Sequence, residues 1–216
     1  MTTTKTELKK SSRNIGLRDF YVAEVEQDDT TGYKAGTPVK LARAISAKIT
    51  EKYNTTTFYS DDSVEDVIGQ FQNGEIEIEI NKLSNADVVK LYDTIYVDGY
   101  LCRSGRDKAK LVALGWRTLK ADNTYDFEWL YCVKFSERPE REYKTNGESI
   151  EDVTSTLKGT FYNRQKEDTI DGKTKPLFGI CVDEAELVDS DTTAKEAITD
   201  WFSKVQEYTA PTTTQS

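Results

Sequence analysis

The residues of this chain that could do chemistry are acidic side chains and cysteines, because the sequence contains no histidine. Histidine is the commonest general base and a frequent metal ligand, so its absence removes most hydrolase and oxygenase mechanisms. Neighbouring carboxylates can act as acid and base or bind Ca²⁺, but adjacent strand residues point to opposite faces, and the spaced ligands of a calcium loop are missing. We interpret the acidic pairs as solvated turns: Asp28-Asp29, Asp61-Asp62 and Asp183-Glu184.

Other chemical motifs in the sequence are equally weak. Residues 168–173 (DTIDGK) faintly suggest a calcium loop but lack the closing Glu. Cys102 lies near Arg103 and Arg106, which can lower the pKa of a thiol, yet it has no histidine partner for a nucleophilic role. P-loop, GxGxxG and GxSxG motifs are absent. The sequence therefore predicts no catalytic residue, no metal site and no cofactor, and the protein is expected not to be an enzyme.

The composition of the 216-residue chain favours a soluble, sheet-rich protein. Twelve Tyr, eight Phe and three Trp accompany 37% hydrophobic and 31% charged residues. The net charge of −9 argues against a protein that wraps nucleic acid through a basic patch. Three cysteines without CxxC spacing argue against disulfides and zinc and favour a reducing cytoplasm. No apolar run is long enough for a membrane helix, so no membrane contact is expected.

Residues 74–80 show the clearest periodic pattern of the chain, a strict alternation of isoleucine and glutamate. Such alternation predicts a half-buried β-strand with one apolar and one wholly anionic face. The apolar residues are Ile76, Ile78 and Ile80, and the anionic ones are Glu75, Glu77 and Glu79.

A short helix is predicted directly after this strand. Ala86, Val89 and Leu91 have helical spacing and are expected to face inward. Ser84 and Asp87 have the spacing of a capping box. Because this helix follows the strand so closely, it must lie across a sheet.

Residues 51–73 give mixed signals. Residues 55–60 have strand composition, whereas residues 64–71 fit a strand or a frayed helix. A long stretch without a clear period in a compact domain is usually functional or mobile. Two alternatives stay open: an extended hairpin arm and an ordinary pair of edge strands.

Most of the remaining chain is predicted to form strands. They are expected at 19–26, 39–49, 111–119, 125–135, 177–182 and, as a pair, within 150–164, with a turn and excursion at 94–110 and a polar excursion at 165–175. The 111–135 hairpin is rich in aromatic residues, which we interpret as core: Trp116, Phe127, Trp129, Tyr131 and Phe135.

A closing helix is predicted over residues 193–208. Thr193 and Glu196 would form its capping box, and its apolar stripe consists of Ala197, Ile198, Trp201, Phe202 and Val205. Residues 1–14 and 209–216 are polar and are expected to be flexible, which leaves residues 15–208 as one domain.

Several segments, in order along the chain, resemble the major tail proteins of long-tailed, non-contractile phages of Gram-positive bacteria. They are IGLRDFYVAEV (15–25), GTP (36–38), YSDD (59–62), GEIEIEI (74–80), VALGWRTLKADNTYDFEWLYCVKFSERPEREYKTNGES (112–149), LKGTFYNR (157–164) and ITDWFSKV (198–205). The resemblance covers roughly residues 15–206. Residues 169–175 and the long N-terminal arm depart from the family pattern.

This resemblance implies a structural virion protein with a mainly β (α+β) fold, an antiparallel β-sandwich or barrel with one flanking helix and a C-terminal helix. Such proteins associate into hexameric rings that stack into a tail tube, assembled in the host cytoplasm. The implied partners are further copies of the chain, the tape-measure protein, the tail terminator and distal tail proteins, and DNA in transient passage.

The resemblance also suggests roles for two segments. A long hairpin bridges one ring to the next in this family, and its candidate residues here are Thr55, Phe58, Tyr59, Asp61, Asp62, Val64 and Phe71. Glu75, Glu77 and Glu79 either face a lumen that conducts DNA, where they would keep phosphates from sticking, or form an ordinary solvated strand face. The alternative function is a β-sandwich binding module of a phage surface or receptor-binding structure.

Overall fold

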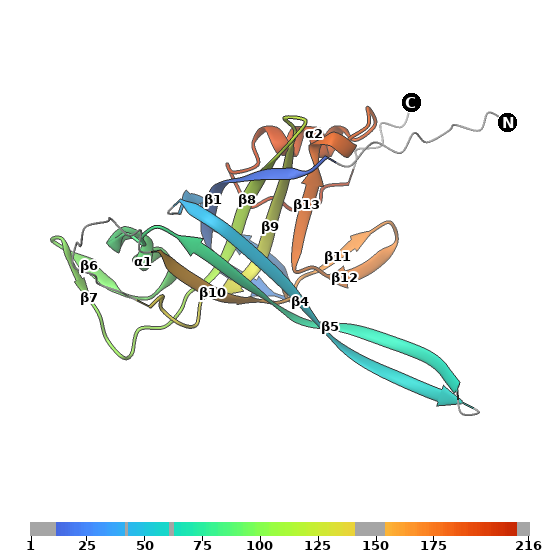
Figure 1. Cartoon of the computed structure of the whole chain (residues 1–216), viewed down its shortest axis with the longest axis horizontal. Coiled ribbons are helices and arrows are strands. Elements are labelled where there is room, and N and C mark those ends of the chain that lie inside the picture. The colour runs from blue at the N-terminus through green and yellow to red at the C-terminus, as the bar shows by residue number, and fades with distance from the viewer. Residues whose placement is uncertain (1–11, 42, 61–62, 141–153, 211–216) are drawn as a thin grey trace, which may run out of the picture.

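The computed structural model describes residues 12–41, 43–60, 63–140 and 154–210, and these form a mainly β protein with antiparallel strand pairs (Figure 1). The strands are β1 (Asn14–Asp29), β2 (Gly32–Ala35), β3 (Val39–Lys40), β4 (Ala44–Ser60), β5 (Ser63–Ile80), β6 (Ile95–Val97), β7 (Tyr100–Cys102), β8 (Leu111–Lys120), β9 (Tyr125–Lys134), β10 (Ser155–Phe161), β11 (Glu167–Ile170), β12 (Lys173–Pro176) and β13 (Gly179–Asp183). The helices are α1 (Asn85–Leu91), α2 (Thr192–Thr199) and a 3₁₀ turn at Glu184–Glu186.

One sheet folds over on itself to enclose the main core. Its strand order is β2-β1-β8-β9-β10-β5-β4, with β13 also paired to β9 and β3 to β1. Strands β9 and β10 share only two residue pairs, Lys134 with Thr160 and Val133 with Phe161. At this joint the sheet turns, so that β4 and β5 cross in front of β8 and β9 (Figure 1). The mainly β, antiparallel part of the predicted fold class is therefore confirmed.

The alternating strand at 74–80 packs as predicted. Ile76, Ile78 and Ile80 are fully buried against the residues of β1, β8, β9 and β10, whereas Glu75 and Glu77 are exposed and Glu79 is half-buried. Each isoleucine buried in this way stabilises the fold by about 1.5–3 kcal/mol. The aromatic residues of the β8–β9 hairpin are also buried, which confirms that they belong to the core: Trp116, Phe127, Trp129, Tyr131 and Phe135.

Helix α1 confirms the predicted cap and one of the three residues predicted to face inward, Leu91. Ser84 and Asp87 form the full capping box. The buried apolar residues are Val88 and Leu91, while Ala86 is exposed and Val89 only half-buried. Val88 and Leu91 are three positions apart and share one face of the helix, and they pack onto the main core.

The closing helix is shorter than predicted, and its predicted capping box is wrong. Helix α2 ends at Thr199, and its N-cap residue is Asp191, which makes no side-chain capping bond. The amide of Gln206 donates to the carbonyls of Asp200 and Trp201, and the Trp129 indole also donates to the latter. These side chains thus donate hydrogen bonds to carbonyl groups that would accept from backbone N–H groups if the helix continued.

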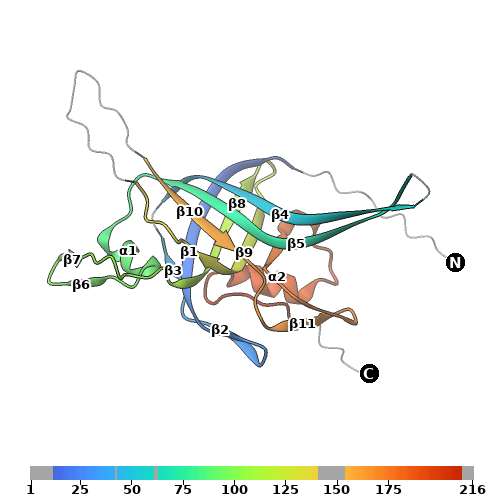
Figure 2. The same ribbon diagram turned by 90° about the horizontal axis from the view of Figure 1, so that it is seen from below.

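A second apolar cluster lies on the opposite face of β1, β8 and β9 from the main core. Trp201 is buried there against Phe127 and Trp129, and the remaining predicted stripe residues pack around it: Ala197, Ile198, Phe202 and Val205. The predicted stripe is therefore confirmed, although only part of it is helical (Figure 2).

Several other predicted elements differ in extent. Strand β1 is longer than 19–26, and it contains a register shift beside Asp19, which has a positive φ of 53°. The described part of 150–164 holds one strand, β10, instead of a pair. The excursions at 94–110 and 165–175 contain the hairpins β6–β7 and β11–β12. Most of the predicted flexible ends, 1–11 and 211–216, lie outside the described residues.

The described residues of the segment 51–73 form an extended hairpin, and the frayed helix considered for residues 64–71 is wrong. Strands β4 and β5 stay paired from Ala44 with Ile80 to Ser60 with Ser63. The inner half of this pair belongs to the sandwich, and the outer half projects beyond the body as a two-stranded ribbon (Figures 1 and 2). We call this outer half, described over residues 53–60 and 63–71, the β4–β5 arm.

Candidate functional site

The β4–β5 arm exposes apolar side chains on both of its strands. Phe58 and Tyr59 on β4 are 47% and 71% exposed, and Val64 on β5 is 56% exposed. Val67 and Ile68 are exposed as well. Isolated two-stranded hairpins are marginal in water, and exposed apolar strands usually mark a contact surface.

The predicted arm residues fall into three groups: exposed residues of the arm, residues outside the described part of the chain, and Phe71 at the root of the arm. Thr55, Phe58, Tyr59 and Val64 lie on the projecting part and are exposed. Asp61 and Asp62 lie outside the described residues.

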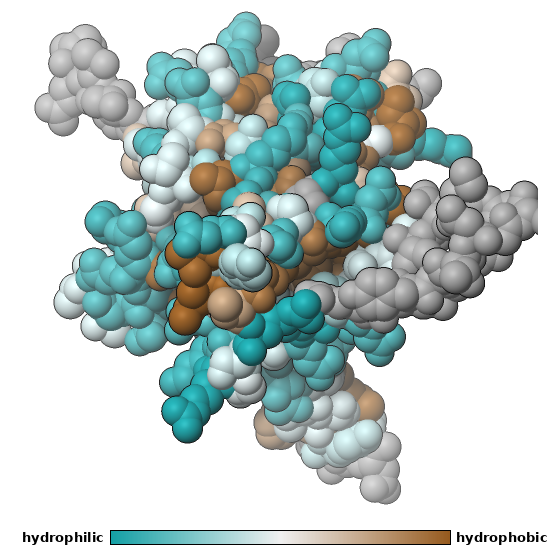
Figure 3. Space-filling model, turned by 90° about the vertical axis from the view of Figure 1, so that its left-hand side faces the viewer, coloured by the Kyte–Doolittle hydropathy of each residue, from teal (hydrophilic) through white to brown (hydrophobic). Residues whose placement is uncertain are grey.

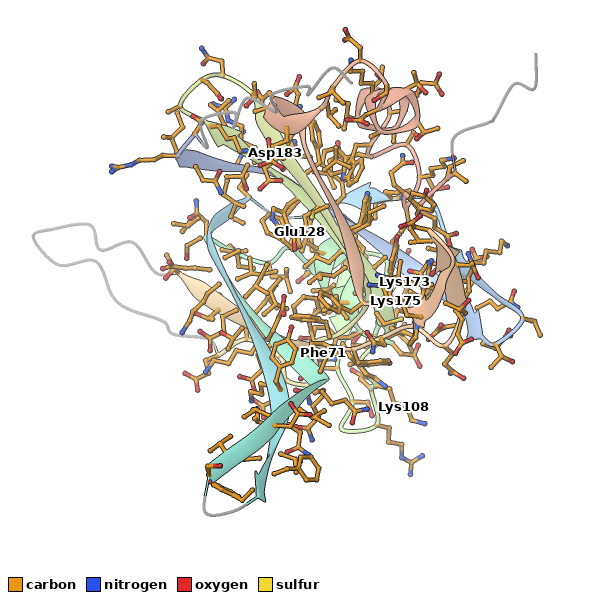
Figure 4. All side chains as sticks on the ribbon, turned by 90° about the vertical axis from the view of Figure 1, so that its right-hand side faces the viewer. Phe71, Lys108, Glu128, Lys173, Lys175 and Asp183 are labelled. Carbon is orange, nitrogen blue, oxygen red and sulfur yellow. The ribbon has the colours of Figure 1, made fainter. Side chains whose placement is uncertain are left out.

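Phe71 lies at the root of the arm, where the arm leaves the body (Figure 4). Its ring stacks on Phe178 at 4.7 Å and on Phe161 at 6.2 Å, and it contacts the ring of Tyr53 edge-on at 5.8 Å. Phe71 therefore fastens the arm to the core and does not belong to the free surface.

The glutamate row of β5 lies in the middle of a polar sheet face, because β5 is paired on both sides. Glu77 is opposite Lys48 of β4 and Lys158 of β10. Glu75 forms an ion pair with Lys52. The face of the single strand is anionic, as predicted, but the face of the sheet is not, since the three glutamates are interleaved with three lysines.

Hydroxyl groups complete this face. The Glu79 carboxylate accepts hydrogen bonds from Ser46 Oγ at 3.1 Å and from Thr154 Oγ1 at 2.9 Å. Two hollows of about 330 and 460 Å³ open along the same face beside Lys158 and Glu137. Their walls are charged and hydroxyl-bearing, so they offer little apolar surface to a small ligand.

Four of the six residues in the acidic pairs are described, and their carboxylates organise turns. Asp28 accepts the Gln165 backbone N–H at 2.7 Å. Asp29 accepts from the Thr31 hydroxyl and backbone, which hold its pKa near 2. Asp183 pairs with Lys120 and accepts the Ala185 N–H.

Glu184, the partner of Asp183 in its pair, has a similar structural role, because its carboxylate accepts the Tyr125 backbone N–H at 2.8 Å. Residues 168–173 form a β-hairpin turn with Asp171 and Gly172 at positive φ, so they do not form a calcium loop. Among the described residues, no group of three or more His, Cys, Asp or Glu side chains is placed to hold a metal ion. The three cysteines are free thiols, and Cys102 is exposed.

Glu128 is an acidic residue that the sequence did not single out. It lies on β9 between Trp116 of β8 and Cys181 of β13. Burial is the largest cause that raises its pKa from 4.5 to about 7, and the charges of Asp126 and Glu51 contribute to the same rise. The carboxyl is therefore neutral in the folded protein below about pH 7.

Arg164 organises a second structure that sequence patterns did not indicate. Its side chain is fully buried, with the guanidinium 4.1 Å from the ring centre of Tyr131 and 5.0 Å from that of Tyr33. It pairs with Asp168 at 2.5 Å and with Glu207 at 2.7 Å. These contacts tie strands β2, β9 and β11 to the C-terminal segment.

The β6–β7 hairpin is a second protrusion, and its apolar residues are exposed like those of the arm. The sequence predicted only a turn and an excursion here. Asp98-Gly99, flanked by Ile95–Val97 and Tyr100–Cys102, is a recognisable hairpin signal, and both turn residues have positive φ.

The sequence matches none of the protein-family models with which it was compared, and a search of curated proteins also found no match. Within the described residues, no helix is long and apolar enough to cross a membrane.

Proposed function

We propose that this protein is a structural subunit that associates with further copies of itself into stacked rings, forming the tail tube of a long-tailed, non-contractile phage. The observation that carries the proposal is the β4–β5 arm. It projects from a packed sandwich and presents Phe58, Tyr59 and Val64 to solvent. An arm of this kind gains its stabilising contacts from another molecule.

The ordered segments shared with major tail proteins give this assembly its biological setting. They imply hexameric rings, a tape-measure protein inside the tube, and terminator and distal tail proteins at its ends. They also imply DNA passage through the lumen and a location in the virion tail. The proposal assigns the chain no catalytic role and no cofactor.

Under this proposal, the polar sheet face that contains Glu75, Glu77 and Glu79, here called the glutamate face, has a role that differs from the one predicted from the sequence. If the face lined the lumen, it would present Glu75, Glu77 and Glu79 among Lys48, Lys52 and Lys158. Screening confines the field of such a mixed surface to within about 8 Å at physiological salt. A charge-balanced wall would neither bind nor strongly repel DNA, which differs from the purely anionic wall that the sequence suggested.

The test is negative-stain electron microscopy of the purified full chain over a range of concentrations. We expect rings or tubes for the unaltered protein and only folded monomers for a variant without the arm. A deletion of 55–71 would also remove the Phe71 stack, so the sharper variant replaces residues 55–69 by a two-residue Asn-Gly turn between Asn54 and Gln70, which are already paired. Tubes formed by this variant would contradict the role of the arm.

The exposed rings of Tyr59 and Tyr100, at 71% and 73%, favour a second candidate function, a binding module of a phage surface structure. Tyrosine is common at such contact surfaces. This candidate predicts a monomer that persists at high concentration, so the same microscopy separates the two functions.

A further inference from the structure

The β6–β7 hairpin presents an apolar surface that the rest of the described chain leaves uncovered. Ile95 and Val97 on β6 are 67% and 54% exposed, and Tyr96 between them is also exposed, so both faces of the strand meet solvent. Tyr100 begins β7 on the other side of the Asp98-Gly99 turn. Figure 3 views this end of the molecule and shows hydrophobic surface gathered in the middle of the face, with hydrophilic residues around it.

The base of this hairpin is held firmly. The Asp93 N–H donates to the Lys108 carbonyl at 2.8 Å, and Tyr92 pairs with Ala109. Asp107 accepts from Thr94 at 3.1 Å and from Arg138 at 2.5 Å. The hairpin is therefore a fixed projection, and its exposure does not come from a loose attachment.

The chain that returns from this hairpin adds positive charge. Arg103, Arg106 and Lys108 are exposed, and within the described part of the chain none of them forms an ion pair. Asp107, the acidic residue among them, is already neutralised by Arg138. The β6–β7 end thus combines exposed aromatic and β-branched residues with three exposed cations and two exposed carboxylates, Asp93 and Asp98, which leaves a small excess of positive charge.

The β4–β5 arm has the complementary character. It exposes Phe58, Tyr59, Val64, Val67 and Ile68, and Asp66 lies exposed among them. Between residues 53 and 71 the sequence contains four acidic residues and no Lys or Arg. Opposite charge around two apolar surfaces favours their association and excludes like-charged partners.

The two surfaces lie at opposite ends of the long axis of the molecule (Figure 1). One chain therefore cannot join its own arm to its own β6–β7 hairpin, but two copies placed end to end can. Contacts between different surfaces of identical subunits are heterologous and propagate from copy to copy.

We propose that the β6–β7 hairpin of one copy, with Arg103, Arg106 and Lys108, receives the β4–β5 arm of the next copy. This inference rests on the proposed self-assembly and names the surface that the arm contacts.

The test is a charge exchange between two variants. In the arm variant, Thr55 and Asp66, both exposed, are each replaced by Lys, and in the hairpin variant, Arg103, Arg106 and Lys108 are each replaced by Glu. Each variant alone brings like charges together, so each should need about tenfold or more protein to form stacked tubes, which corresponds to about 1.4 kcal/mol per tenfold. An equal mixture restores opposite charges at every contact and should form tubes at the concentration of the unaltered protein.

A matched control is Lys173→Glu with Lys175→Glu, which inverts two exposed cations on the β11–β12 hairpin (Figure 4) and should leave tube formation unchanged. Circular dichroism verifies that every variant is folded. If the unaltered protein forms tubes and either charge variant alone does so equally well, or if the mixture of folded variants does not, the proposed contact is wrong while self-assembly stands. If the unaltered protein forms neither rings nor tubes, the proposed function itself fails.

Discussion

Burial decides the charge state of Glu128, because its carboxyl lies between Trp116 and Cys181 inside the sheet. The unfolded chain releases the proton of a glutamate near pH 4.5, whereas the folded protein holds it to about pH 7. Between these values the folded state binds more protons, so the free energy of unfolding falls as the pH rises through this window. Above pH 7 the full cost, roughly 3 kcal/mol, is present.

We expect Glu128→Gln to remove this cost. The variant should be more stable than the unaltered protein by up to about 3 kcal/mol at pH 8 and nearly equal to it at pH 4.5. Denaturant unfolding at both pH values measures the difference. Glu167→Gln, at an exposed position, should show no such pH dependence. An equal difference at both pH values for Glu128→Gln would contradict the role of burial.

Gly74 is required by the close approach of an aromatic ring. A Cβ at this position would lie 1.9 Å from Cζ of Phe161, whose ring is fully buried. We expect Gly74→Ala to destabilise the protein by about 1–3 kcal/mol, as for other overpacked cores. Gly69→Ala, further along β5 with no atom within 4 Å of the added Cβ, should be neutral or stabilising by up to about 1 kcal/mol. Thermal unfolding of both variants checks the contrast, and equal effects would exclude the steric reason.

At the scale of elements, Arg164 joins parts of the chain that are distant in sequence. Its two ion pairs reach Asp168 on β11 and Glu207 in the C-terminal segment, and its guanidinium lies over the rings of Tyr131 and Tyr33. A flat, delocalised cation suits both the rings and the two carboxylates.

We expect Arg164→Met to destabilise the protein by about 3–5 kcal/mol, because it leaves the nearly buried Asp168 carboxylate with only the more distant ammonium of Lys166, 3.4 Å away. Arg164→Lys should restore only part of the stability, since an ammonium cannot stack or bridge in the same way. The control is Lys166→Met, whose pair with Glu207 is about one-third exposed and should contribute less than about 1 kcal/mol. Chemical unfolding and protease sensitivity of the C-terminal segment measure the effects.

Local patterns were sufficient to predict some elements and insufficient for others. The alternation at 74–80 and the Ser84–Asp87 cap depend on residues close in sequence, and both are found as predicted. The lysines beside Glu77 depend on the register of β4 and β10, which no local pattern specifies. The early end of α2 involves Gln206 and Trp129, whose side chains donate to the carbonyls of Asp200 and Trp201 just beyond the helix, and no local pattern specifies these contacts.

The hairpin at 51–73 shows the same limit. Apolar and polar residues alternate little along its strands, because the outer part is exposed on both faces and neither face packs against a core. Whether residues 64–71 formed a strand or a helix was therefore open until the pairing with β4 was known.

At the scale of the whole molecule, the face that carries Glu75, Glu77 and Glu79 offers a test of orientation in the proposed tube. The lumen role predicts that replacing Glu75, Glu77 and Glu79 by Lys makes this face cationic, so that phosphates bind to it and DNA ejection slows. The neutral control replaces the same residues by Gln and should assemble normally. Phage infectivity and DNA release are the measurements, and normal ejection from virions that carry the Lys variant would rule out the lumen role.

The placement of the arm and the β6–β7 hairpin at opposite ends has a consequence for growth. Under the proposed contact, every assembly has one end that offers free arms and another that offers free hairpins, so it is a polar filament. A polymer of this kind elongates above a critical concentration and contains no signal to stop. The length of such a filament must then be set by a molecule outside the chain.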